Sequence, residues 1–162
     1  MRSIVPGQPT VPPVAAHRGE AWASAINETA VHDAVEVTLL TLAVVDDLVR
    51  ITGLVRVRDR TDLRLTSVPP LDLVGLPGGS ELRLLHARAQ PHTAVTWTSW
   101  TYERPEPVPS RLEARLARLE LEYRIGGAAR IEAVGPWEFS FPVSQPAPTD
   151  GATRDGDIIG RT

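Results

Sequence analysis

Apolar and polar residues alternate along short segments of this 162-residue chain, and Pro, Gly or Asp residues separate the segments. The clearest case is residues 48–58, where Val49, Ile51, Val55 and Val57 occupy one side of an extended chain and Arg50, Thr52, Arg56 and Arg58 the other. A period of two residues is typical of a β-strand with one buried face. This pattern favours a sheet protein.

A second segment, residues 35–45, precedes this one across Asp46-Asp47, which predicts a hairpin with a tight reversal. Further strands are expected over residues 63–68, 71–74, 81–89, 93–103, 119–125, 130–134 and 137–143. Short strands joined by Gly/Pro turns are typical of a sandwich or barrel. We expect an all-β, immunoglobulin-like antiparallel β-sandwich of about seven to nine strands.

One segment departs from the alternation. Ser110 to Glu113 forms a capping-box pattern, and Leu112, Leu116 and Leu119 have helical spacing. A short helix near 111–118 is the expectation, and the alternative is a strand that begins near Ala114. Outside the sandwich domain at 31–143, composition predicts an irregular N-terminal arm at 1–30 and a flexible C-terminal tail at 144–162.

Composition excludes several chemistries. The chain has no Cys, and all 17 of its Lys and Arg residues are Arg. These absences rule out disulfides, thiolate metal sites, Schiff-base lysines and P-loop lysines. A net charge of -3 argues against nucleic acid as a partner. The sequence shows neither a signal peptide nor an apolar run that would insert in a membrane, so we expect a cytoplasmic protein. The alternative is a part of a larger exported or membrane-attached assembly.

The order of these signals resembles a known domain. Asn-Glu-Thr at 27–29 precedes the hairpin HDAVEVTLLTLAVVDDLVRITGLVRVR, and RLELEYRI and GPWEFSFPV follow. Over residues 27–143 this resembles the immunoglobulin-like domain in the extracytoplasmic part of bacterial anti-sigma-factor-type membrane proteins. The resemblance implies a sandwich and no catalytic residues. These 162 residues depart from the family pattern, because we expect neither its membrane helix nor its partner domain within them.

Aromatic residues near position 100 are the sharpest functional candidates. Alternation places Trp97 on one face of its strand and Trp100 and Tyr102 on the other. We hypothesise that Trp100 and Tyr102 anchor a partner, a role that requires them to be exposed, because exposed Trp and Tyr are common anchors of interfaces. The alternative is that Trp97 fills the core and that the other two residues pack beneath the N-terminal arm around Trp22.

The Arg residues offer a second candidate surface. Arg56 and Arg58 share an outward face and would orient a partner. The competing interpretation is an outer sheet on which Arg residues pair with neighbouring Asp and Glu residues.

No catalytic motif is present. The chain has no G-x-S-x-G elbow. His86 and His92 would need a carboxylate such as Glu81 or Glu103 to bind zinc, and ordinary strand histidines are the simpler interpretation. We therefore expect a non-catalytic protein-interaction or structural module without cofactor or metal, whose partner is another protein or a second copy. The alternative is a carbohydrate-binding module that uses the same aromatic residues.

Overall fold

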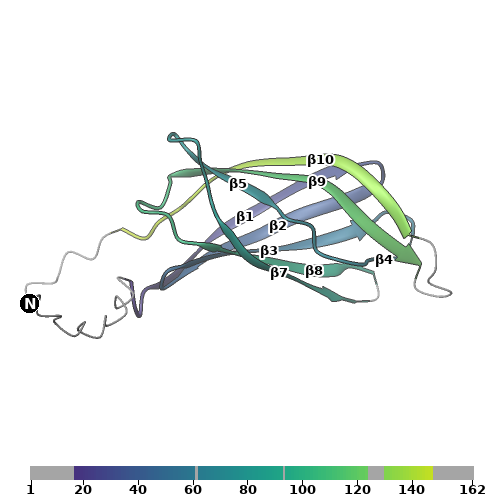
Figure 1. Cartoon of the computed structure of the whole chain (residues 1–162), viewed down its shortest axis with the longest axis horizontal. Helices are drawn as coiled ribbons and strands as arrows, with labels where there is room; N and C mark the ends of the chain where they lie inside the picture. Colours follow the sequence, from purple (N-terminus) through teal and green to yellow (C-terminus); the bar gives the residue numbers. More distant parts are fainter. Residues whose placement is uncertain (1–16, 61, 93, 124–129, 148–162) are drawn as a thin grey trace, which may run out of the picture.

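The computed structural model describes residues 17–60, 62–92, 94–123 and 130–147, and its strands form two antiparallel sheets (Figure 1). The first sheet has the order β1-β2-β3-β8-β7, and the second has the order β10-β9-β5-β6, with β4 also paired to β9. The strands are β1 (Ala21–His32), β2 (Val35–Val45), β3 (Leu48–Val57), β4 (Leu63–Leu65), β5 (Asp72–Leu76), β6 (Ser80–Glu81), β7 (Leu84–Pro91), β8 (Thr96–Glu103), β9 (Arg111–Tyr123) and β10 (Arg130–Pro142). The predicted all-β sandwich is confirmed.

The predicted hairpin of residues 35–45 and 48–58 is confirmed as β2 and β3, which meet at the pair Val45 and Leu48. The register of β2 shifts between Leu39 and Thr41. Buried positions therefore pass from Leu39 to Leu42 instead of continuing on the odd-numbered side. This bulge explains why the second half of β2 is apolar on both faces in the sequence.

The expected helix near 111–118 is wrong, because β9 runs unbroken from Arg111 to Tyr123. Leu112 and Leu116 point into the core, whereas Ala117 and Arg118 are both exposed. The next buried residue is Leu119, beside a register irregularity of the partner strand β10. At this irregularity the consecutive buried residues Leu116 and Leu119 are three positions apart, a spacing that is also typical of a helix.

The irregular N-terminal arm at 1–30 also needs correction, because β1 begins at Ala21 and pairs along β2. Its buried positions include Ser24 and Ile26, and its exposed positions include alanines. With small and polar residues on both sides, the strand lacks the apolar alternation by which the others are found. Of the tail predicted at 144–162, residues 148–162 lie outside the described residues, as do residues 1–16 of the arm.

Three buried aromatic side chains connect the two sheets by hydrogen bonds to backbone carbonyls. Trp100 Nε1 of β8 donates to Pro69 O at 2.9 Å, and Tyr102 Oη donates to Leu71 O at 2.5 Å, in the segment before β5. From the second sheet, Trp137 Nε1 of β10 donates to Val35 O of β2 at 3.0 Å. Each polar group is thereby satisfied where water is excluded.

Gly53 of β3 makes room for this arrangement. A Cβ atom at Gly53 would lie 2.7 Å from Thr38 O and 3.3 Å from the Trp100 ring. Only a residue without a side chain permits this close approach of β2, β3 and the indole.

In the part of the chain that the structure describes, no helix has the length and apolar character needed to cross a bilayer.

We expect Tyr102→Phe to lower the free energy of unfolding by about 1–3 kcal/mol, because it leaves the Leu71 carbonyl buried without a donor. Urea denaturation followed by fluorescence measures the change. Tyr123→Phe is the matched control and should cost less than about 0.5 kcal/mol, since Tyr123 is half-exposed beside Arg60. Equal losses in both variants would contradict the assigned role of the Tyr102 hydroxyl.

Candidate functional site

The expected exposure of Trp100 and Tyr102 is wrong, because each is 0% exposed in the core. Burial raises the pKa of the Tyr102 hydroxyl above its ordinary value of 10.0. The alternative interpretation is wrong for Trp97, which is 44% exposed instead of buried in the core. Because alternate side chains of a strand point to opposite faces, the burial of Trp100 and Tyr102 places Trp97 outside.

Trp97 lies beside a shallow hollow of about 460 Å³ on the outer face of the first sheet. Polar side chains line the hollow around it, among them Gln90, Arg88, Ser99 and Thr52. They come from the neighbouring strands β7, β8 and β3, so the hollow is built on paired strands and not on a loop.

The strand register defines the surface around Trp97. Cross-strand partners form three rows over β3, β8 and β7. The rows are Leu54, Trp97 and Gln90; Thr52, Ser99 and Arg88; and Arg50, Thr101 and His86. We call these nine residues the Trp97 face. It combines one large aromatic group with guanidinium, amide, imidazole and hydroxyl groups.

The structure holds Arg56 and Arg58 in ion pairs with one carboxylate. Arg56 Nη2 lies 3.0 Å from Glu36 Oε1, and Arg58 Nε lies 3.1 Å from Glu36 Oε2. The hydrogen bond from Arg56, followed by that from Arg58, lowers the pKa of the Glu36 carboxyl below its ordinary 4.5, against the opposing effect of burial. This is the arrangement of the competing interpretation, in which Arg residues of the outer sheet pair with acidic neighbours.

Two other guanidinium groups on the same outer face have no such partner. Arg50 and Arg88 are exposed, and their side chains form no ion pair or hydrogen bond with a described residue. Thr101 lies between Arg50 and His86 in its row, is buried, and leaves its hydroxyl oxygen without a hydrogen-bond partner in the described residues.

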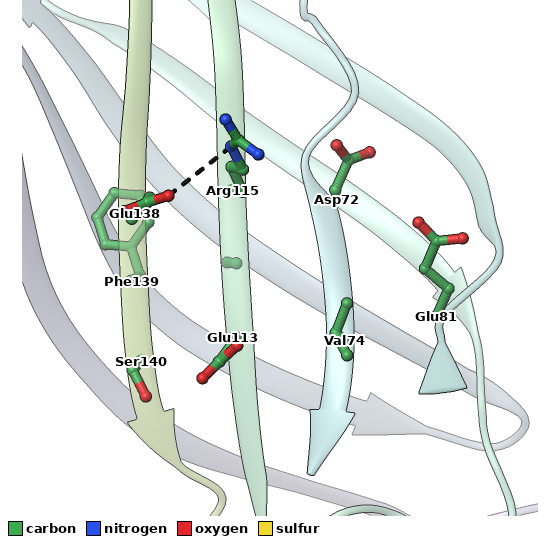
Figure 2. A pocket seen from close by; sticks show the side chains of 9 residues that line it. Asp72, Val74, Glu81, Glu113, Arg115, Glu138, Phe139 and Ser140 are labelled. Carbon is green, nitrogen blue, oxygen red and sulfur yellow. Dashed lines mark ion pairs between the residues drawn. The ribbon is translucent and has the colours of Figure 1, made fainter. Parts of the chain in front are cut away.

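The outer face of the second sheet has the opposite character. Asp72, Glu81, Glu113 and Glu138 line a hollow of about 550 Å³, together with Arg115 (Figure 2). Arg115 Nε lies 3.8 Å from Glu138 Oε1, the ion pair drawn dashed in Figure 2. The other three carboxylates have no side-chain partner among the described residues, so this hollow carries uncompensated negative charge.

A polar cluster joins three loops at one end of the sandwich. The largely buried Arg104 lies 3.0 Å from Glu20 and 3.5 Å from Glu106, and it donates to the Asp46 carbonyl at 3.2 Å. The hydrogen bond from Arg104 lowers the pKa of the Glu20 carboxyl. His17 bridges Glu20 and Glu106. These contacts have the character of a structural clasp between loops.

The two histidines considered for zinc are not assembled with a third ligand. His86 lies on β7 and His92 follows that strand. Within the described ranges, no group of three or more His, Asp or Glu side chains is placed to hold a metal ion.

Sequence reasoning missed Trp97, Arg88 and Gln90 as members of one surface. The alternation identified the two faces of β8, but both faces carry aromatic groups, so alternation could not decide which one is buried. In residues 81–89 the apolar alternation changes phase between Leu84 and Leu85, where the register of β7 against β8 is irregular. The cross-strand neighbours of Trp97 were therefore not evident.

Comparison with known proteins returns no relative. The sequence matches no protein-family model. Neither the curated proteins nor the solved structures provide a match.

We expect Glu36→Gln to lower the free energy of unfolding by up to about 1 kcal/mol at pH 7, because two guanidiniums lose their partner. A carboxyl whose pKa is lowered by folding stabilises the fold above its ordinary pKa, and this stabilisation is lost as pH falls through the folded-state pKa. The difference between wild type and variant should therefore shrink below pH 4.5. Urea denaturation at pH 7 and at about pH 3 measures it.

Glu120→Gln is the matched control, since the exposed Glu120 side chain has no partner in the described residues. It should show no such dependence on pH. A Glu36→Gln difference that is equal at both pH values would contradict the assigned ion pairs.

Proposed function

We propose that this protein is a non-catalytic binding module that uses the Trp97 face to bind another protein. The supporting observation is an exposed Trp on a rigid sheet, beside a hollow and surrounded by polar side chains. Trp and Arg are enriched among the residues that contribute most to protein–protein affinity. Trp97 replaces Trp100 and Tyr102 as the aromatic anchor, and Arg88 and Arg50 replace the paired Arg56 and Arg58.

Protein is favoured over carbohydrate as the partner. A platform of Trp100 and Tyr102 does not exist, since both are buried. Trp97 is the one aromatic residue among the exposed large hydrophobic residues of the described ranges. Uncompensated guanidiniums beside it match an anionic protein surface better than a neutral sugar.

We propose in addition that the sandwich is of the immunoglobulin-like type. Two packed antiparallel sheets are compatible with an immunoglobulin-like domain, and with the resemblance to the extracytoplasmic domain of anti-sigma-factor-type membrane proteins. Both the assignment and a cytoplasmic location stay predictions.

The test is photo-crosslinking at the proposed face in cells that express the protein. A photoreactive residue at Gln90, the cross-strand partner of Trp97, should capture a defined partner, whereas one at Val134 should not. Val134 is 60% exposed on the other sheet and is the matched position. Trp97→Ala should raise the Kd for the captured partner about thirtyfold or more, the loss typical of a central aromatic anchor.

Circular dichroism should show that Trp97→Ala keeps the β-sheet fold. Val134→Ala is the control substitution and should leave Kd unchanged. Equal capture by wild type and Trp97→Ala would reject the proposal, and so would binding on a glycan array in the absence of any captured protein.

A further inference from the structure

The Trp97 face carries positive charge that no described residue of the chain neutralises. Arg50 and Arg88 have no ion-pair partner among the described residues. Two carboxylates on the outer side of the same sheet are already paired, since Glu36 is held by Arg56 and Arg58, and Glu103 lies 3.6 Å from Arg83. The chain has a net charge of -3. Two guanidiniums without an ion-pair partner in the described residues therefore give this face a local positive charge, opposite in sign to the net charge.

The register fixes how these groups are spaced. Arg50 on β3 and Arg88 on β7 are separated by the single strand β8 and by one row along the strands. That places their Cα atoms about 12 Å apart, from a strand spacing of about 4.8 Å and a rise of about 3.3 Å per residue. An extended segment covers the same distance in about four residues, and its residues i and i+4 point to the same side.

We propose that the partner presents an extended acidic segment to the Trp97 face, with carboxylates paired to Arg50 and Arg88. This inference rests on the proposed function. Guanidinium and carboxylate groups form paired, charge-assisted hydrogen bonds. The segment lies along the hollow and its side chains contact Trp97.

A second copy of this chain is a poorer occupant. Its uncompensated carboxylates Asp72, Glu81 and Glu113 line a hollow. The surface beside Trp97 is also hollowed, and two concave surfaces cannot pack closely against each other. A single extended segment is narrow enough to fill such a hollow, whereas the hollowed surface of a folded second copy is not.

The test is an NMR titration of the protein with synthetic peptides of about ten residues. The acidic probe alternates Ser and Glu, and the matched probes alternate Ser with Gln or Ser with Lys. The acidic probe should shift the Trp97 indole N–H signal, and its affinity should fall several-fold when NaCl rises from about 25 to about 250 mM. The Gln and Lys probes should bind at least about tenfold more weakly.

Substitutions locate the charges. Arg88→Gln and Arg50→Gln should each raise the Kd of the acidic probe about two- to fivefold, and the double variant about tenfold. Arg130→Gln is the matched control, because Arg130 is an exposed Arg on the second sheet that also lacks a side-chain partner among the described residues. It should leave Kd unchanged.

Three kinds of result would overturn the inference. One is binding that does not depend on charge, seen as equal binding of the Gln and Glu probes or as an unchanged Kd in the double Arg variant. Another is tighter binding of a sulfated heparin oligosaccharide through the same Arg residues, which would make the occupant a polyanionic sugar. The third is a shift of the Trp97 signal with protein concentration alone, which would make it a second copy.

The same variants separate this inference from the proposed function. If crosslinking at Gln90 depends on Trp97 but the acidic probe does not shift the Trp97 signal, only the proposal of an acidic segment is rejected. Crosslinking that does not depend on Trp97 rejects the binding function itself, whichever peptide binds.

Discussion

Three buried hydrogen bonds from aromatic side chains hold the two sheets in one relative position. Trp100 and Tyr102 donate from the first sheet to the backbone before β5, and Trp137 donates from the second sheet to β2. Apolar packing alone has no direction, whereas a buried indole or phenol must meet an acceptor or lose free energy. These donors therefore specify which residues face each other across the core, and Gly53 supplies the space that the Trp100 ring needs.

The outer surface follows from this core. A strand that turns Trp100 and Tyr102 inward must turn Trp97 and Ser99 outward. Pairing of β8 with β3 and β7 then brings Arg50 and Arg88 to the sides of the same strand. Trp97 thus lies on the middle one of these three strands, and β8 is paired on both sides. A binding surface of this kind is preorganised, so a partner bears little cost in ordering it.

Local sequence patterns predicted most of the fold correctly. The hairpin of β2 and β3, the outward side of β3 and the approximate positions of the later strands follow from alternation and turn residues alone. The errors share a cause. In β9 and β2 a register irregularity changes which side is buried, and in β1 small side chains hide the alternation. A bulge depends on the partner strand, so a pattern within one segment does not reveal it.

For the site, the sequence by itself determined that Trp97 must oppose Trp100 and Tyr102, and that Arg50, Arg56 and Arg58 share a face, because side-chain direction alternates along any strand. Only the tertiary structure decided which side of β8 is buried. It also decided which Arg residues meet a carboxylate, since Glu36 reaches Arg56 and Arg58 across β2 and β3 while Arg50 and Arg88 meet none in the described part of the chain. The physical reason is that burial and charge pairing depend on neighbours that are distant in the sequence.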